Sequence, residues 1–181
     1  GMTRADTPEQ ATFRVDVGQG NPISNWIYAL VAPFPTVLDG VTGQALKDAW
    51  NGQSNPNFGG SPLLVTESTL YVFSRLWGDP AAGAVRVVEE DQLMDLAWES
   101  RPSWALLPFE RLSPRWKVLA VDGMAPIEKG FDLQGYALKV PISLAGEPLE
   151  ASVLPASNRD ADKLTTLVMT GVTALVRATA Y

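Results

Sequence analysis

The feature that most constrains the fold is a regular alternation of short apolar runs and helical patterns between Pro62 and Val121. The apolar runs have the length of buried strands, and the segments between them carry apolar residues at helical spacing, such as Leu70, Phe73 and Leu76. The predicted strands are 62–65, 84–88, 104–107 and 118–121, and the predicted helices are 66–77 and 89–99. Strands that alternate with helices through short connections predict an α/β fold with a largely parallel sheet.

The residues on either side of this region extend the predicted sheet. Residues 12–17 alternate between apolar and polar, and residues 26–32 form a near-continuous apolar run that suits a strand buried on both faces. Thr42 is a plausible N-cap for a helix over residues 43–50. Residues 135–144 predict a further strand, which we expect at an edge of the sheet or bulged at Pro141. The expected architecture is therefore a three-layer α/β/α sheet.

The chain of 181 residues is long enough for one domain with a sizeable core. We expect that domain over residues 12–145, after a polar segment, 1–11, that is a disordered tail or a remnant of tag cleavage. Residues 146–162, with small residues, prolines and charges, predict a linker. Residues 163–181 predict a strand, 164–171, and a helix from Thr173. They form either the start of a second domain or a tail that docks back on the first.

Composition excludes several classes of function. The chain has no histidine and no cysteine, which removes thiolate or imidazole zinc sites and Ser-His-Asp or Cys-His catalysis, and we expect no cofactor. The net charge of −6 argues against nucleic acid as a partner and against a polybasic contact with a membrane. No run of about 18 apolar residues is present, so we expect no membrane span.

The first candidate site is the turn Thr66-Glu67-Ser68-Thr69, where a predicted strand leads into a helix. Backbone N–H groups and hydroxyls at a helix N-terminus can bind an anion, which makes Thr66, Ser68 and Thr69 candidate ligand contacts. The alternative is capping of the helix by Thr66 or Ser68, with Glu67 favoured there by the helix dipole.

The second candidate site is the loop between the strands 104–107 and 118–121, which holds aromatic and charged residues that usually have a role in a loop. Arg111 and Arg115 could brace the loop through a salt bridge with Glu110, or an arginine could bind a carboxylate or a phosphate. Arg115 is the candidate contact. Asp122-Gly123 predicts a turn.

Two further groups of residues favour structural roles. The acidic residues Glu89, Glu90, Asp91 and Asp95 could bind Mg²⁺ or Ca²⁺, but a solvated helix start explains them better. The six tryptophans are placed for core packing at helix ends and beside strands, although Trp104 or Trp116 could line a cleft.

Several motifs, in order, resemble type 2 periplasmic binding proteins of the phosphate-binding kind. They are a helix ending in Trp-x-Gly at Trp50, a V-x-G-x-x-P segment at Val121, and a closing Y-x-L strand at Tyr136. The combination looks most like the domain that precedes the phosphoesterase-like domain in CapA-type capsule and poly-gamma-glutamate biosynthesis proteins. The resemblance covers residues 26–144. Residues 164–177 look like the first strand of that next domain, although Val172 stands where the family usually has a metal-binding Asp.

The resemblance implies an extracytoplasmic, non-catalytic solute-binding-like domain. It would bind a small anionic solute or an envelope polymer through Thr66, Ser68, Thr69 and Arg115, or serve as a scaffold for a phosphoesterase-like domain in the same chain. Two alternatives stay open at this point. One is a part of a metal-dependent phosphoesterase-like enzyme of capsule synthesis, and the other is a protein–protein assembly module.

Overall fold

The computed structural model describes residues 7, 10, 13–18, 22–146 and 155–167. Its main elements are, in chain order, β1 (Phe13–Val17), β2 (Ser24–Pro33), β3 (Gly40–Val41), α1 (Gly43–Trp50), β4 (Leu63–Val65), α2 (Glu67–Trp77), β5 (Val85–Val87), α3 (Leu93–Glu99), β6 (Trp104–Pro108), the 3₁₀ turn η2 (Phe109–Arg111), β7 (Trp116–Val121), β8 (Lys139–Gly146) and the 3₁₀ turn η4 (Ala161–Lys163). Most of the predicted strands and helices are confirmed to within a few residues. Helix α3 begins at Leu93 rather than at Glu89.

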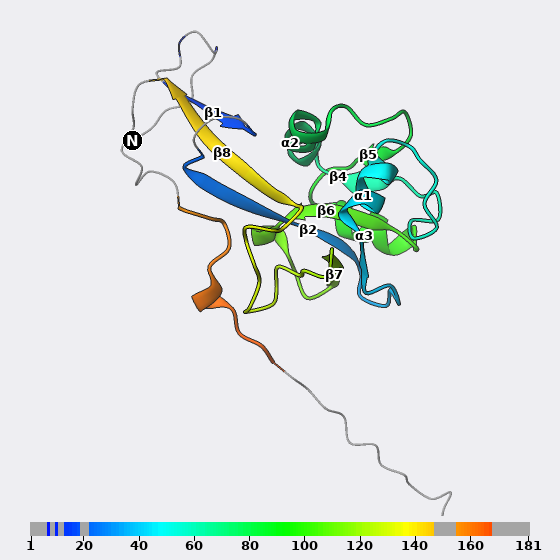
Figure 1. The fold of residues 1–181 in the computed structure, drawn as a ribbon. Coiled ribbons are helices and arrows are strands. Elements are labelled where there is room, and N and C mark those ends of the chain that lie inside the picture. The colour runs from blue at the N-terminus through cyan, green and yellow to red at the C-terminus, as the bar shows by residue number, and fades with distance from the viewer. Residues whose placement is uncertain (1–6, 8–9, 11–12, 19–21, 147–154, 168–181) are drawn as a thin grey trace, which may run out of the picture.

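The long strand β2 is the axis of the sheet, whose order is β1-β8-β2-β6-β4-β5. Its first half pairs with β8, and its second half pairs with β6 on one edge and with β7 on the other. Figure 1 shows the β1–β8 ribbon extending from one end of β2, while the helices gather around the other end. Residues Ile27 to Ala32 are at most 5% exposed, which confirms the prediction of a strand buried on both faces.

Alternating side chains of the central strands divide the core into two layers. On one face Leu30 of β2 and Leu106 of β6 join α1 and α2, which contribute Leu46, Trp50 and Phe73. On the other face the neighbouring strand residues, such as Val31 and Leu107, pack against Leu93 and Ala97 of α3. Because a strand presents successive side chains to opposite faces, one sheet separates the two helical layers. The predicted three-layer α/β/α architecture is confirmed.

The expectation of a largely parallel sheet is wrong. Among the described strands, the parallel pairs are β4 with β5, β4 with β6, and β3 with β7. Strand β2 is antiparallel to β6, β7 and β8, and β1 is antiparallel to β8. A parallel neighbour needs a crossover, usually a helix, and α2 and α3 supply crossovers only among β4, β5 and β6. The apolar patterns predict strands but carry no information on their direction.

Strand β8 lies between β1 and β2, so the expectation that it forms an edge is also wrong. Its proline is tolerated because of where β1 ends. The Pro141 carbonyl accepts a hydrogen bond from Gly18 N at 3.0 Å, so the backbone polar groups of Pro141 face the β1 side. Pairing with β1 begins one residue later, at Ile142 with Val17. The missing N–H of proline therefore falls beyond the end of the ladder.

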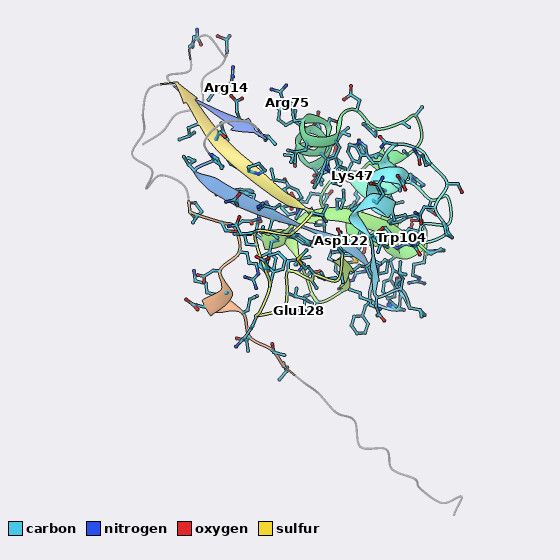
Figure 2. All side chains as sticks on the ribbon, viewed as in Figure 1. Arg14, Lys47, Arg75, Trp104, Asp122 and Glu128 are labelled. Atoms are coloured by element: carbon cyan, nitrogen blue, oxygen red, sulfur yellow. The ribbon has the colours of Figure 1, made fainter. Side chains whose placement is uncertain are left out.

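The predicted turn at Asp122-Gly123 is confirmed and has a second role. Asp122 and Gly123 have positive φ angles of 52° and 77°, and Val121 and Met124 exchange backbone hydrogen bonds across them. Asp122 Oδ1 accepts a hydrogen bond from Gly43 N at 2.9 Å, at the start of α1 (Figure 2). A Cβ at Gly43 would lie 2.7 Å from the other carboxylate oxygen, so this close approach requires glycine.

The C-terminal predictions are only partly within the described residues. Residues 164–167 of the predicted strand carry no strand, and residues 168–181, with the predicted helix, lie outside the described part. Residues 155–159, inside the predicted linker, contact the domain. Asn25 N donates to Ala156 O at 2.9 Å, Asn25 forms a parallel bridge with Ser157, and Arg159 donates to the carbonyls of Pro126 and Glu128.

Candidate functional site

A cleft of about 500 Å³ opens between the β1–β8 ribbon and the start of α2. It lies beyond the carboxyl ends of the parallel strands β4 and β6, which is where open α/β sheets bind ligands. Its lining residues come from β1, β2, α2, β6, η2 and β8, with one residue after β5. They are Val15, Val17, Trp26, Tyr28, Thr66, Ser68, Tyr71, Val72, Glu90, Leu107, Pro108, Glu110, Arg111, Val140 and Ile142.

The start of α2 is capped by its own side chains. Thr66 Oγ1 accepts a hydrogen bond from Thr69 N at 3.3 Å and lies 3.0 Å from the hydroxyls of Ser68 and Thr69. The predicted capping by Thr66 is therefore present. Thr66 and Ser68 also line the cleft, so their contact with a ligand stays a prediction.

The other two predicted contacts are not brought to the cleft. Thr69 is fully buried behind Thr66. Arg115 forms an ion pair with Asp95 at 3.1 Å, and its guanidinium lies 6.0 Å from the ring of Trp98 on α3. Trp98, which we expected in the core, is 36% exposed and is covered by Arg101 at 4.2 Å. Arg115 therefore braces its loop against α3 rather than lining the cleft.

The cleft has a different arginine at its mouth. Arg111 pairs with Glu90 at 2.9 Å, and both residues are exposed and line the cleft. Glu110 is not the partner of either arginine. Its carboxylate accepts a hydrogen bond from Asn158 Nδ2, while Asn158 also binds the backbone N and O of Ile27 at 2.7 and 3.0 Å.

Tyr28 places a buried hydroxyl-bearing ring in the wall of the cleft. The residue is 5% exposed, and its ring meets Phe73 edge-on at 5.1 Å. Burial raises the pKa of Tyr28 to about 12, and the nearby negative charge of Glu110 adds to the shift. The raised pKa keeps Tyr28 neutral, and its hydroxyl able to donate a hydrogen bond, into the alkaline range.

Two of the four acidic residues considered as metal ligands are used in ion pairs. Glu90 pairs with Arg111 and Asp95 with Arg115. Within the residues that the structure describes, no group of three or more acidic side chains is arranged to hold a metal ion. No helix in the same part of the chain is long and apolar enough to cross a bilayer.

Sequence reasoning missed the aromatic and acidic members of the cleft, above all Trp26, Tyr28 and Glu110. A signal for Glu110 was present, because it follows the predicted strand 104–107 at its carboxyl end, as Thr66 follows β4. The contribution of the β1–β8 ribbon had no such signal, since it depends on antiparallel pairing between strands more than 120 residues apart, such as Val17 with Ile142.

The layered sheet, with a cleft at the carboxyl ends of β4 and β6, defines a fold of mixed α/β type. Two solved structures share it. One is an ABC-type phosphate transport receptor from Vibrio cholerae, with 18% identity and a TM-score of 0.57 over 78% of this chain and 63% of the receptor. The other is a putative phosphate ABC transporter substrate-binding protein from Clostridium perfringens with bound phosphate, with 16% identity and a TM-score of 0.53 over 82% of this chain and 66% of that protein.

At sequence identities of 18% and 16%, the likeness to these two structures shows a shared fold. The chain spans less than two thirds of the length of both structures, 63% and 66%. No protein-family model matches the sequence, and a search of curated proteins gives no match.

Proposed function

We propose that this chain is a non-catalytic, solute-binding-like domain that takes a small ligand of the cell envelope into the cleft between the β1–β8 ribbon and α2. The observation that carries the proposal is the position of that cleft at the carboxyl ends of β4 and β6. The cleft is large enough for a small organic molecule, since ligand pockets start at roughly 300 Å³. The fold shared with two phosphate-binding-type structures supports the same class of function.

The finer part of the proposal is the biological context. The ordered motifs at Trp50, Val121 and Tyr136 resemble the domain that precedes the phosphoesterase-like domain of CapA-type capsule and poly-gamma-glutamate biosynthesis proteins. We place the domain outside the cytoplasm on this resemblance. Its ligand would then be a small anionic solute or a piece of an envelope polymer.

A thermal-shift screen tests ligand binding most cheaply. The panel is phosphate, sulfate, glutamate oligomers, neutral sugars and a small aromatic amine, each added to the chain at millimolar concentration. A ligand at 100 times its Kd stabilises a protein by about 2.7 kcal/mol, which raises the melting temperature by several degrees. If no member of the panel shifts the melting temperature by more than about 1 °C, only a scaffold role is left.

The scaffold role is the second candidate, and one observation favours it. Residues 155–159, which precede the rest of the C-terminal segment, are held on the domain by hydrogen bonds from Asn25, Asn158 and Arg159. A segment fixed in this way would set the position of whatever follows it in the chain. The third possibility, a protein–protein assembly module, gains no support from the aromatic loop, because Trp116 in that loop is only 8% exposed.

A further inference from the structure

The interior of the cleft is apolar and aromatic. Ten of its lining residues are aliphatic or aromatic side chains from five elements, among them Trp26, Tyr28 and Tyr71. Tyr71 is 58% exposed at the opening, whereas Tyr28 is buried in the wall. Such walls gain free energy from removing the apolar body of a ligand from water, at about 25 cal/mol per Å². A small hydrated anion has no such body to offer.

The charges at the mouth leave one carboxylate without an opposite charge. The lining residues include two carboxylates, Glu90 and Glu110, and one guanidinium, Arg111. Arg111 is engaged by Glu90 at 2.9 Å. The partner of Glu110 in the structure is the neutral amide of Asn158. The lining side chains therefore sum to one net negative charge, next to aromatic rings that attract cations.

The same arrangement opposes an oxyanion. Among the described residues that line the cleft, the one cationic side chain, Arg111, is already paired with Glu90. Glu67 stands exposed at the first residue of α2, where it repels an incoming anion. These features differ from the converging N–H donors and free cations by which proteins hold phosphate.

We propose that the cleft selects an apolar molecule carrying one protonated amine, with the apolar body between the β1–β8 ribbon and α2 and the ammonium group at Glu110. This inference rests on the proposed function, that the cleft binds a solute, and it replaces the anionic solute that the CapA-type resemblance implies with a cationic one. Glu110 accepts the charged hydrogen bond, and the rings of Trp26, Tyr28 and Tyr71 surround the apolar body.

Calorimetric titration with three probes tests this selectivity. The probes are phenylethylamine, phenylpropionate and inorganic phosphate, of which the first two share an apolar body and differ in the sign of their charge. The variant is Glu110→Gln, which removes the charge but keeps an oxygen that can accept from Asn158. The matched control is Glu99→Gln at the end of α3, outside the cleft.

We expect phenylethylamine to bind the wild type and the Glu99→Gln variant with the same Kd, and phosphate to give no binding heat. Glu110→Gln should weaken the amine about tenfold or more, as expected for a lost hydrogen bond to a charged group. The inference is overturned if the amine fails to bind, or if Glu110→Gln leaves its Kd unchanged. It is also overturned, while solute binding stands, if phenylpropionate or phosphate binds more tightly than the amine. The proposed function is judged separately, by the wider panel of the thermal-shift screen.

Discussion

At the scale of single residues, polar side chains fix the backbone at the points where strands give way to helices. Thr42 and Thr66 cap α1 and α2, as predicted, by accepting from Ala45 N and Thr69 N. Trp50 combines a fully buried ring with a hydrogen bond from Nε1 to Gly78 O at 2.9 Å. Asp122 joins the end of β7 to the start of α1. These few contacts set the positions of the helices on the sheet.

Replacing Asp122 should test this role directly. Asp122→Ala removes the acceptor for Gly43 N and puts alanine at a positive φ angle, so it should lower the free energy of unfolding by about 1–3 kcal/mol. Asp122→Asn keeps an acceptor and tolerates the positive φ angle, so it should retain most of the stability. Urea unfolding of both variants measures the difference, and equal losses would contradict the role of the hydrogen bond.

The buried tyrosines predict a loss of stability in alkali. The pKa of Tyr28 is about 12 in the folded protein, against 10.0 when unperturbed, so between these values the unfolded state releases a proton that the folded state keeps. The contribution of the protonated tyrosine to the free energy of unfolding is full below about pH 10. Above that pH it declines, by up to about 1.4 kcal/mol per pH unit for each such tyrosine. Burial raises the pKa of Tyr136 in the same direction.

Tyr28→Phe should therefore reduce, but not abolish, the decline in the free energy of unfolding between about pH 10 and pH 12. Below about pH 9 the difference between the variant and the wild type should be constant, because neither state titrates there. An alkaline decline that is identical in both proteins would show that Tyr28 does not contribute to it.

At the scale of elements, the segment 155–159 is predicted from sequence to be a linker, but its hydrogen bonds attach it to the domain. The pairing of β6 with β2 ends at Tyr28. At the next residue of β2, Ile27, the side chain of Asn158 donates a hydrogen bond to the backbone O and accepts one from the backbone N. Asn158 therefore takes the place of a neighbouring strand at Ile27. Arg159 continues the attachment, with its guanidinium 4.9 Å from the ring of Phe131. The segment also holds Glu110 at the cleft through Asn158.

Asn158→Ala should release this segment. Hydrogen exchange at the Ile27 amide should accelerate by tenfold or more, since one lost hydrogen bond of about 1.5 kcal/mol corresponds to a factor of about ten. The amide of Leu30, which is paired within the sheet, should exchange at the wild-type rate and serves as the internal control. Unchanged exchange at Ile27 would mean that Asn158 does not hold the segment.

The elements show where prediction from sequence succeeds and where it ends. Strand β2 and helices α1 and α2 are predictable because apolar periodicity and caps such as Thr42 are local signals. The direction of β2 relative to β6, and the place of β8 inside the sheet, depend on pairings between distant residues such as Ser24 and Ile142. The cleft follows from those pairings, so Thr66 and Ser68 could be predicted there, whereas Trp26 and Tyr28 could not.

The difference between the two arginines of the loop, of which Arg111 rather than Arg115 lines the cleft, also depends on contacts between distant residues. Arg111 and Arg115 are four residues apart in one loop, and their sequence context gives both an equal chance of facing a ligand. The 3₁₀ turn η2 directs Arg111 toward Glu90 and the cleft, while Arg115 follows it toward Asp95 on α3. The sequence cannot show which arginine faces the cleft, because the answer depends on the tertiary partners of both, Glu90 and Asp95.

At the scale of the whole molecule, the strands that line the cleft, including the β1–β8 ribbon that forms its outer wall, belong to one continuous sheet. Arg14 of β1 and Arg75 of α2 lie at the same end of the molecule, where the hydrogen bond from Arg14 and, more weakly, the charge of Arg75 lower the pKa of Asp16 (Figure 2). The β1–β8 ribbon and α2 both line the cleft. A ligand in the cleft would contact both.

The central claim is that this cleft binds a solute, and blocking it gives the most direct measurement. The Kd of the solute with the largest thermal shift is measured by calorimetry for the wild type, for Ser68→Trp, which places an indole at the cleft wall, and for Gln44→Trp, an exposed helix position outside it. We predict at least tenfold weaker binding for Ser68→Trp, about 1.4 kcal/mol, and an unchanged Kd for Gln44→Trp. Wild-type affinity in the folded Ser68→Trp variant would contradict the claim.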